Sequence, residues 1–305
     1  MKKYIALFTV LSSFTAMASS PGTVGFQYLK THTAARPAAM GGAFVAVSAD
    51  VNALYYNPAG IANIVKRTAS FTYLNDLLDF NTGFIALVEP EFGPGNLGVS
   101  ILFKDYGRFK RTDGTGQEIG DFTSNAISLA GSYSLRPFQN LMLGVTAKYL
   151  RFAIDTYSAD AIAVDAGFMY YIPVHKLTFA AELFNVGKTL TAFVASRDDL
   201  PTQFKAGFAK ELAHLPLLIS LNLYKYNDEN WHGALGGEFT LTPHVFLRLG
   251  YDEFGRNLKV DSSGDRFAGA AIGLGMVWNN LQIDYSFTSH GELGSLNRFT
   301  ISGQF

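Results

Sequence analysis

The sequence predicts an antiparallel β-barrel that spans a membrane, and three observations lead to that fold class. First, apolar and polar residues alternate from about residue 68 to the end, as they do where a strand faces two environments. Second, many such segments follow one another with almost no helical pattern between them. Third, 16% of the residues are charged and 14% are aromatic, which is typical of a lipid-facing surface with aromatic belts.

The first residues have the pattern of a secretory signal peptide. Lys2 and Lys3 precede an apolar run at 4–10, and Ala16-Met17-Ala18 supplies a small-x-small cleavage site. We therefore expect residues 1–18 to be a signal peptide and the mature chain to begin at Ser19. The chain has no cysteine, which excludes a disulfide framework, and its net charge of −1 gives no indication of nucleic acid as a partner.

Residues 19–66 differ from the rest, because Gly, Ala, Pro and Asn occur there in irregular order and without alternation. We expect this part to be a compact segment outside the sheet, and residues 67–305 to form the barrel. An exported, disulfide-free and aromatic-rich β chain suits the outer membrane of a Gram-negative-type bacterium, with outer-membrane lipid around the barrel.

From residue 68 onward the alternation predicts about fourteen strands, an even number as in bacterial single-chain barrels. They lie near 68–75, 80–88, 96–106, 123–134, 140–152, 160–171, 176–185, 202–211, 216–225, 231–240, 244–252, 267–277, 280–288 and 297–305. The connections support this topology: turns after even-numbered strands are short, which is typical of the periplasmic side, although the turn at 90–95 is rather long. Most loops after odd-numbered strands are longer and polar, at 107–122, 153–159, 186–201, 253–266 and 289–296.

Charged residues in the middle of strands should share the inward face, because a Lys or Arg facing lipid at mid-membrane costs about 2–4 kcal/mol. Seven charged residues stand opposite the apolar face of their own strand and are predicted to line a polar lumen: Lys148, Asp165, Glu182, Lys205, Glu238, Arg248 and Asp284. A soluble sandwich would show the same parity. The strand number, the loop alternation and the terminal aromatic residue favour the barrel.

The last strand ends on Phe305. A C-terminal aromatic residue resembles the signal that the outer-membrane barrel assembly machinery reads, so that machinery is an expected partner.

The N-terminal segment contains a dense motif of small residues. It reads Ala-Arg-Pro-Ala-Ala-Met-Gly-Gly-Ala-Phe-Val-Ala-Val over 35–47, followed by Asn-Ala-Leu-Tyr-Tyr-Asn-Pro-Ala-Gly over 52–60. Gly41 and Gly42 permit a tight bend or close packing. Asn57 precedes a proline, which favours extended backbone at that residue and marks a turn.

This stretch resembles the PorV/PorQ family of outer-membrane proteins, itself related to the FadL-type barrels. The resemblance covers roughly 28 residues of motif, and the strand region matches only in pattern. It implies that Gly41, Gly42, Asn57, Pro58 and Ala59 belong to an N-terminal hatch inside a fourteen-stranded barrel. PorV/PorQ-type proteins are similar to components of type IX secretion, whereas FadL-type barrels pass hydrophobic molecules.

Catalysis and metal binding have little support in the sequence. Asp284, His290 and Ser295 share one hairpin, but no nucleophile elbow surrounds the serine. The six histidines form no ligand cluster, and the two carboxylates of Asp261 and Asp265 are a weak basis for calcium. We therefore expect a barrel without enzymatic activity, cofactor or metal.

Three functions remain open. The first is a PorV/PorQ-like, type IX-like role in protein secretion or surface export, with secretion-machinery proteins and cargo as partners. The second is FadL-like, hatch-gated transport of a hydrophobic small molecule, for which Phe44, Val47, Leu54 and Tyr55 are candidate contacts or simply the core of the hatch. The third is a structural or adhesive barrel.

Overall fold

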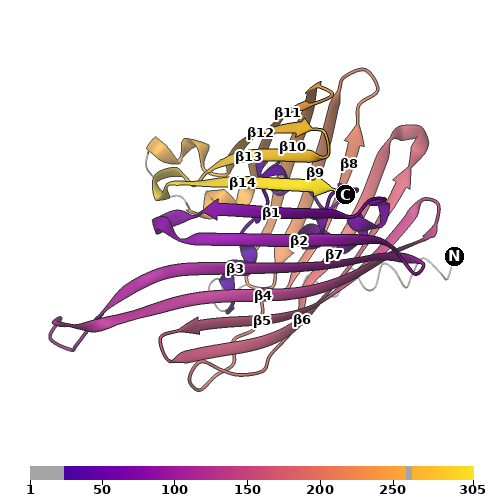
Figure 1. Ribbon diagram of the computed structural model, residues 1–305. Helices are drawn as coiled ribbons and strands as arrows, with labels where there is room; N and C mark the ends of the chain where they lie inside the picture. Colours follow the sequence, from indigo (N-terminus) through magenta and orange to yellow (C-terminus); the bar gives the residue numbers. More distant parts are fainter. Residues whose placement is uncertain (1–23, 259–262) are drawn as a thin grey trace.

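In the computed structural model, which describes residues 24–258 and 263–305, the strands form one closed antiparallel barrel (Figure 1). Each strand pairs with its neighbours in the chain, and β1 pairs with β14 to close the sheet. The strands are β1 (Thr68–Asn75), β2 (Asn81–Phe92), β3 (Gly95–Thr112), β4 (Glu118–Phe138), β5 (Leu141–Ile154), β6 (Tyr157–Ile172), β7 (Leu177–Thr189), β8 (Gln203–Glu211), β9 (Leu217–Tyr226), β10 (Trp231–Thr242), β11 (Val245–Asp252), β12 (Ala270–Trp278), β13 (Leu281–Ser289) and β14 (Ser295–Gln304).

The predicted fold class and strand number are confirmed, and each predicted strand overlaps one observed strand. The signal peptide predicted at 1–18, together with residues 19–23, lies outside the described residues. Asp261 of the weak calcium candidate lies outside them as well.

The predicted loop at 107–122 is wrong, because β3 and β4 continue through most of it as a hairpin that projects beyond the rest of the barrel (Figure 1). Pairing resumes at Arg108↔Thr123 and continues to Thr112↔Glu118. The rings of Phe109 and Phe122 stack there at 5.4 Å. Both faces of this extension are largely exposed, so polar side chains are compatible with strand pairing. Where a segment lies outside the lipid, polar residues alone therefore do not distinguish a loop from a strand.

Three shorter segments also differ from the prediction. The turn at 90–95 is tight, because β2 runs to Phe92 and β3 begins at Gly95. The predicted loop at 153–159 shrinks to residues 155–156 between β5 and β6. The strand predicted from 267 begins at Ala270, since Gly269 has a φ of 91° and interrupts the extended backbone.

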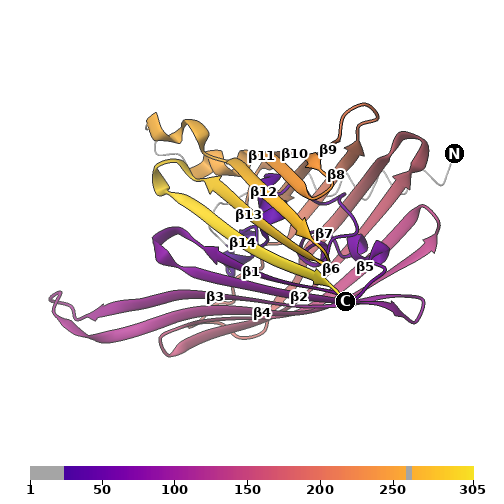
Figure 2. The same ribbon diagram turned by 45° about the horizontal axis from the view of Figure 1, so that its top comes forward.

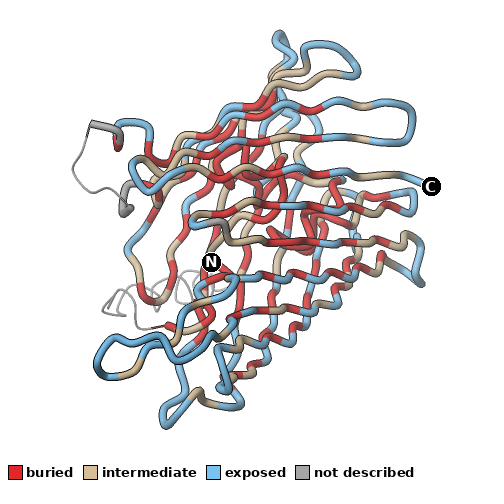
Figure 3. The backbone as a smooth tube through the Cα atoms, turned by 60° about the vertical axis from the view of Figure 1, so that its left-hand side comes forward, coloured by how far each residue is buried: buried red, intermediate tan, exposed pale blue. Residues whose placement is uncertain are grey.

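Buried and exposed residues alternate along the strands of the barrel wall (Figure 3). The exposed residues of the wall are mostly apolar. On β5, Leu143 and Val145 are exposed at 39% and 52%, whereas Met142 and Thr146 are nearly fully buried. The outward set on the other strands is of the same kind, so the barrel presents a continuous apolar surface to its surroundings. This is the surface of an outer-membrane barrel.

Residues 24–66 form the hatch, which lies inside the barrel (Figure 2). The hatch begins at the outer end, where Val24 forms a β-bridge with Asp199 in the loop between β7 and β8. Its short helices are η2 (Gln27–Lys30), α2 (Ala35–Ala39), α3 (Ala53–Tyr56) and η3 (Pro58–Asn63). It leaves at the inner end, where Arg67 precedes β1 and pairs with Glu89 near the first turn. The chain therefore crosses the interior once before the sheet begins.

In the connections of the barrel, the helices among the described residues are short 3-10 helices. They are η4 (Leu77–Asp79), η5 (Pro173–His175), η6 (Glu253–Leu258), η7 (Ser263–Phe267) and η8 (Gly291–Leu293). No helix in the described ranges is long and apolar enough to span a membrane.

Candidate functional site: the hatch and the cavities beside it

The Asn-Pro-Ala motif of the hatch is a capped turn that docks on the barrel wall. Asn57 accepts a hydrogen bond at Oδ1 from the Ala59 N–H (3.0 Å), so it caps η3, and Pro58 occupies the first position of that helix. The Asn57 Nδ2 donates to the Val45 carbonyl at 2.9 Å and to the Phe168 carbonyl of β6 at 3.3 Å. One buried side chain therefore joins two hatch segments and the wall.

The wall is recessed under this motif by a pair of glycines. Gly144 of β5 and Gly167 of β6 are direct register partners. A Cβ at Gly144 would overlap the backbone of Pro58 and Ala59, and a Cβ at Gly167 would overlap Oδ1 of Asn57. Only glycine at these two positions allows the hatch to approach this closely.

A second glycine pair receives the other half of the hatch. Gly236 of β10 and Gly250 of β11 are register partners, and a Cβ on either would overlap the backbone of Met40 or Gly41. Gly41 and Gly42 have φ values of 61° and 73°, so the bend expected there is a left-handed one. Sequence reasoning identified the hatch glycines but missed both wall pairs. The sequence pattern that indicates such a wall pair is two inward-facing glycines at matching positions of neighbouring strands.

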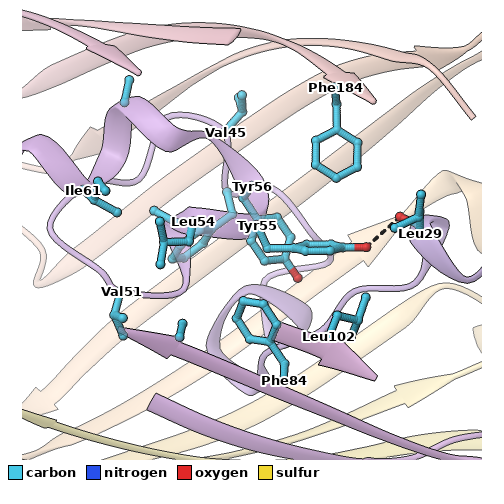
Figure 4. Packing of buried hydrophobic residues seen from close by; sticks show 14 of the residues in the cluster. Leu29, Val45, Val51, Leu54, Tyr55, Tyr56, Ile61, Phe84, Leu102 and Phe184 are labelled. Carbon is cyan, nitrogen blue, oxygen red and sulfur yellow. Dashed lines mark hydrogen bonds between the residues drawn. The ribbon is translucent and has the colours of Figure 1, made fainter. Parts of the chain in front are cut away.

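Between the two docking points the hatch is packed with apolar side chains (Figure 4). The Tyr55 ring lies edge-on to Phe84 and Phe184, with centroids 5.8 and 5.5 Å apart, and its hydroxyl donates to the Leu29 carbonyl at 2.7 Å. Of the four candidate ligand contacts, Phe44 and Leu54 are buried in this core. Val47 borders an inner cavity and Tyr55 borders a narrow cavity beside the hatch.

The seven mid-strand charges are all buried, and each is ion-paired with another of the seven. The Lys148–Asp165 and Lys205–Glu182 pairs have N–O distances of 2.6 and 2.8 Å. Arg248 pairs with both Glu238 and Asp284 at 2.6 Å. These residues therefore compensate one another inside a filled barrel rather than facing open water.

Arg36 joins the hatch to one of these ion pairs, and sequence reasoning missed it. Its guanidinium binds Glu238 of β10 through two hydrogen bonds of 2.6 and 2.7 Å, and it binds Asp50 of the hatch at 2.8 Å. Arg36 and Arg248 thus share Glu238, which makes a buried network across the boundary between hatch and wall. The sequence motif contains Arg36, but its ion-pair partners depend on the path of the hatch through the barrel.

Cavities lie on both sides of the hatch. The outer cavity has a volume of about 310 Å³, and the larger inner cavity has a volume of about 520 Å³. A narrow cavity of about 30 Å³, bordered by Tyr55 and Phe184, shares several lining residues with the outer one. Val47 and Arg36 of the hatch line the inner cavity. The hatch is therefore the partition between an outer and an inner space.

The outer cavity combines apolar walls with a few polar groups. Leu77, Phe254 and Leu296 supply apolar surface from three different connections or strands. Arg298 of β14 and His290 of the loop before it line the same cavity. Ligand pockets typically have this composition, and about 300–1,000 Å³ is their usual size.

The candidate triad does not assemble. Asp284 is bound by Arg248 and Gln282, and both ring nitrogens of His290 have no hydrogen-bond partner. In residues 24–258 and 263–305, no group of three His, Cys, Asp or Glu side chains could hold a metal ion. Phe305 follows β14 and is exposed at 67%, while its N–H donates to the Arg67 carbonyl at 2.9 Å.

Comparison with known proteins identifies the fold through solved structures. No model of a known protein family matches the chain, and no curated protein matches its sequence. The toluene transporter TbuX of Ralstonia pickettii superposes with a TM-score of 0.62 at 12% identity, over 93% of this chain and 99% of that one. A FadL homologue of Pseudomonas aeruginosa gives 0.59 at 14% identity, over 90% and 98%. The toluene transporter TodX of Pseudomonas putida gives 0.58 at 11% identity, over 93% and 96%.

The fold and its interior define an outer-membrane β-barrel whose lumen is filled by an N-terminal hatch. Its fourteen-stranded architecture is that of the FadL-type barrels. Two of these similar structures are described as toluene transporters.

Proposed function

We propose that this barrel passes a hydrophobic small molecule across the outer membrane, with the hatch as its gate. The observation that carries the proposal is the outer cavity of about 310 Å³, which ends against the hatch and has an inner cavity on the opposite side. The FadL-type fold supports it, since two barrels of this fold are described as toluene transporters. Passage would require the hatch to shift, because the hatch and its buried core lie between the two cavities.

Uptake of radiolabelled toluene and decanoate by Gram-negative cells that lack a barrel of this kind tests the proposal. Expression of the protein should raise the initial uptake rate of at least one probe. Leu77→Trp would fill the outer cavity and should reduce that gain several-fold. Leu293→Trp is the matched control, because Leu293 is 46% exposed in a neighbouring loop and does not line the cavity. No gain for either probe, or an equal loss in both variants, would contradict the proposal.

A PorV/PorQ-like role in protein export is the second candidate. Two observations favour it: the motif of the hatch, and the projecting β3–β4 hairpin, which offers a polar surface to a protein partner. Because the hatch fills the lumen, the barrel would then act as a docking component and not as the pore. Co-purification of secretion-machinery or cargo proteins with a ligand-free barrel from its own outer membrane would favour this candidate over uptake.

A further inference from the structure

A shallow groove of about 470 Å³ lies on the lipid-facing side of the barrel, across β3, β4 and β5. Gly131 and Ala147 are register partners in this groove, and their small side chains leave the surface low at this point. The exposed side chains of Leu129 and Tyr149 border it. A Cβ at Gly131 would meet no atom within 4 Å, so the space above it is open. The groove is therefore a recess in the apolar surface that an acyl chain can enter.

Charged side chains face outward at the outer ends of β5, β6 and β7, next to this groove. Arg151 of β5 and Asp160 of β6 are register partners, and Nη1 of Arg151 is 3.2 Å from Oδ1 of Asp160. The Asp160 carboxylate also accepts hydrogen bonds from the hydroxyls of Tyr149 at 2.6 Å and Thr191 at 3.0 Å. The negative charge of Asp160 is therefore already paired within the wall.

Lys188 of β7 is the charged residue of this group that has no partner. It is exposed and in register with Ile162 of β6, which in turn pairs with Tyr149 of β5. In the described part of the chain, no Asp or Glu oxygen lies within 4.0 Å of its amino group. On the inner side of Lys188, the outward-facing neighbours Val186 and Val164 are apolar and exposed. Lys188 therefore lies at the outer edge of the apolar band, at the level of lipid head groups.

We propose that the lipid-facing patch formed by this groove, Arg151, Asp160 and Lys188 binds a lipid A molecule of the outer leaflet. The longer loops and the projecting β3–β4 hairpin are at this end of the barrel, which makes it the cell-surface end. The patch has two cations and one acid, so it complements an anionic head group.

The two parts of a lipid A molecule match the two parts of the patch. A glucosamine phosphate pairs with Lys188 and with the side chain of Arg151, which is 47% exposed, and an acyl chain lies in the groove beside Gly131. The site is on the outside of the wall, so this inference does not depend on what passes through the barrel.

Native mass spectrometry of the mature protein, released from detergent micelles after titration with lipid, tests the proposal. The probes are hexa-acylated, bis-phosphorylated lipid A, the same acylated disaccharide without its phosphates, and phosphatidylglycerol. The first two share their acyl chains and differ only in charge. We expect phosphorylated lipid A to bind at least about fivefold more tightly than either of the other two probes.

Two variants, each with a matched control, locate the lipid. Lys188→Gln should weaken phosphorylated lipid A about fivefold and leave the dephosphorylated form unchanged. Lys210→Gln is its control, because Lys210 is exposed at the inner end of β8 and has no acidic partner among the described residues. Gly131→Leu would fill the groove and should weaken both forms alike. Gly237→Leu is its control, since a Cβ at this lipid-facing residue of β10 would meet only Cδ1 of Leu217, at 3.5 Å.

The outcomes decide between a specific lipid site and ordinary contact with the membrane. Equal affinity for the phosphorylated and dephosphorylated lipids, or an equal effect of Lys188→Gln and Lys210→Gln, would overturn the proposal. Phosphatidylglycerol that binds as tightly as lipid A would also overturn it, because the patch would then accept any anionic lipid. Lys188 makes no hydrogen bond in the described residues, so its substitution should leave the fold intact.

Discussion

The inner and outer parts of the barrel interior both contain inward-facing polar residues, but they differ in how far their charged residues are ion-paired. In the middle of the barrel and towards its inner end, every one of the seven predicted lumen charges has a partner of opposite sign, and Arg36 extends the pairing into the hatch. Near the outer end, Arg298 has only neutral acceptors and His290 has none. The Arg36–Glu238 pair joins the hatch to the wall, whereas Arg298 and His290 border the outer cavity. The comparison predicts that changes at the inner contacts lower stability, and that changes at the outer cavity alter binding.

The largest expected effect is at the glycine recess under the Asn-Pro-Ala motif. Gly167→Val would place a Cβ against the Asn57 amide, so the motif would have to leave its site and lose its hydrogen bonds to the wall. We expect the free energy of unfolding to fall by about 3 kcal/mol or more. Urea unfolding in detergent measures this loss. Single-channel recording should show increased conductance as the hatch loosens.

Gly131→Val is the matched control for this substitution. A Cβ at Gly131 of β4 would meet no atom within 4 Å, because this position is on the outer face. The control should therefore retain the stability and the conductance of the unaltered protein. If both substitutions behave alike, the glycine pair does not dock the hatch.

The next largest effect is expected at Arg36. Arg36→Met leaves Asp50 without its cation and Glu238 with only Arg248. Breaking a fully buried pair costs about 3–5 kcal/mol, but Arg36 borders the inner cavities, where water can replace it, so we expect about 2 kcal/mol. Adding Asp50→Asn should restore part of the loss, because it removes the carboxylate left unpaired.

Arg67→Met provides the comparison with an exposed pair. Nε of Arg67 and Oε2 of Glu89 are 2.5 Å apart at the inner rim of the barrel, where both side chains are more than a third exposed. Such exposed pairs contribute little to stability, because solvent screens both charges. An Arg36→Met variant no less stable than Arg67→Met would refute the role given to the buried network.

The parts of this architecture that the sequence predicts are those with a local signal. Alternation of side chains is local, so all fourteen strands were found from it, and the parity of Lys148 and Asp284 correctly indicated the inner face. The β3–β4 extension was missed because its residues are polar, and polarity is ambiguous where no lipid surrounds a strand.

The candidate site is less predictable because its contacts join distant parts of the chain. Gly144 and Gly167 become a recess only when the register of β5 and β6 is known. Arg36 and Glu238 are 202 residues apart, and Arg298 meets the His32 carbonyl across 266 residues. No spacing rule in a single sequence connects such pairs, since the path of the hatch through the barrel determines them.

The smallest expected effect on stability is at His290, and it depends on pH. Burial and Arg298 lower the pKa of His290 to about 4, whereas the pKa of a histidine in the unfolded chain is about 6.5. Between these two values the unfolded state binds a proton that the folded state does not, so stability is complete above about pH 6.5 and falls as the pH drops towards 4. His290→Gln removes this titration and should flatten the decline in the urea midpoint between pH 7.5 and pH 5, while the exposed His214→Gln should not. If the urea midpoint of His290→Gln declines as steeply as that of the unaltered protein, then His290 is not a buried neutral group on the outer cavity.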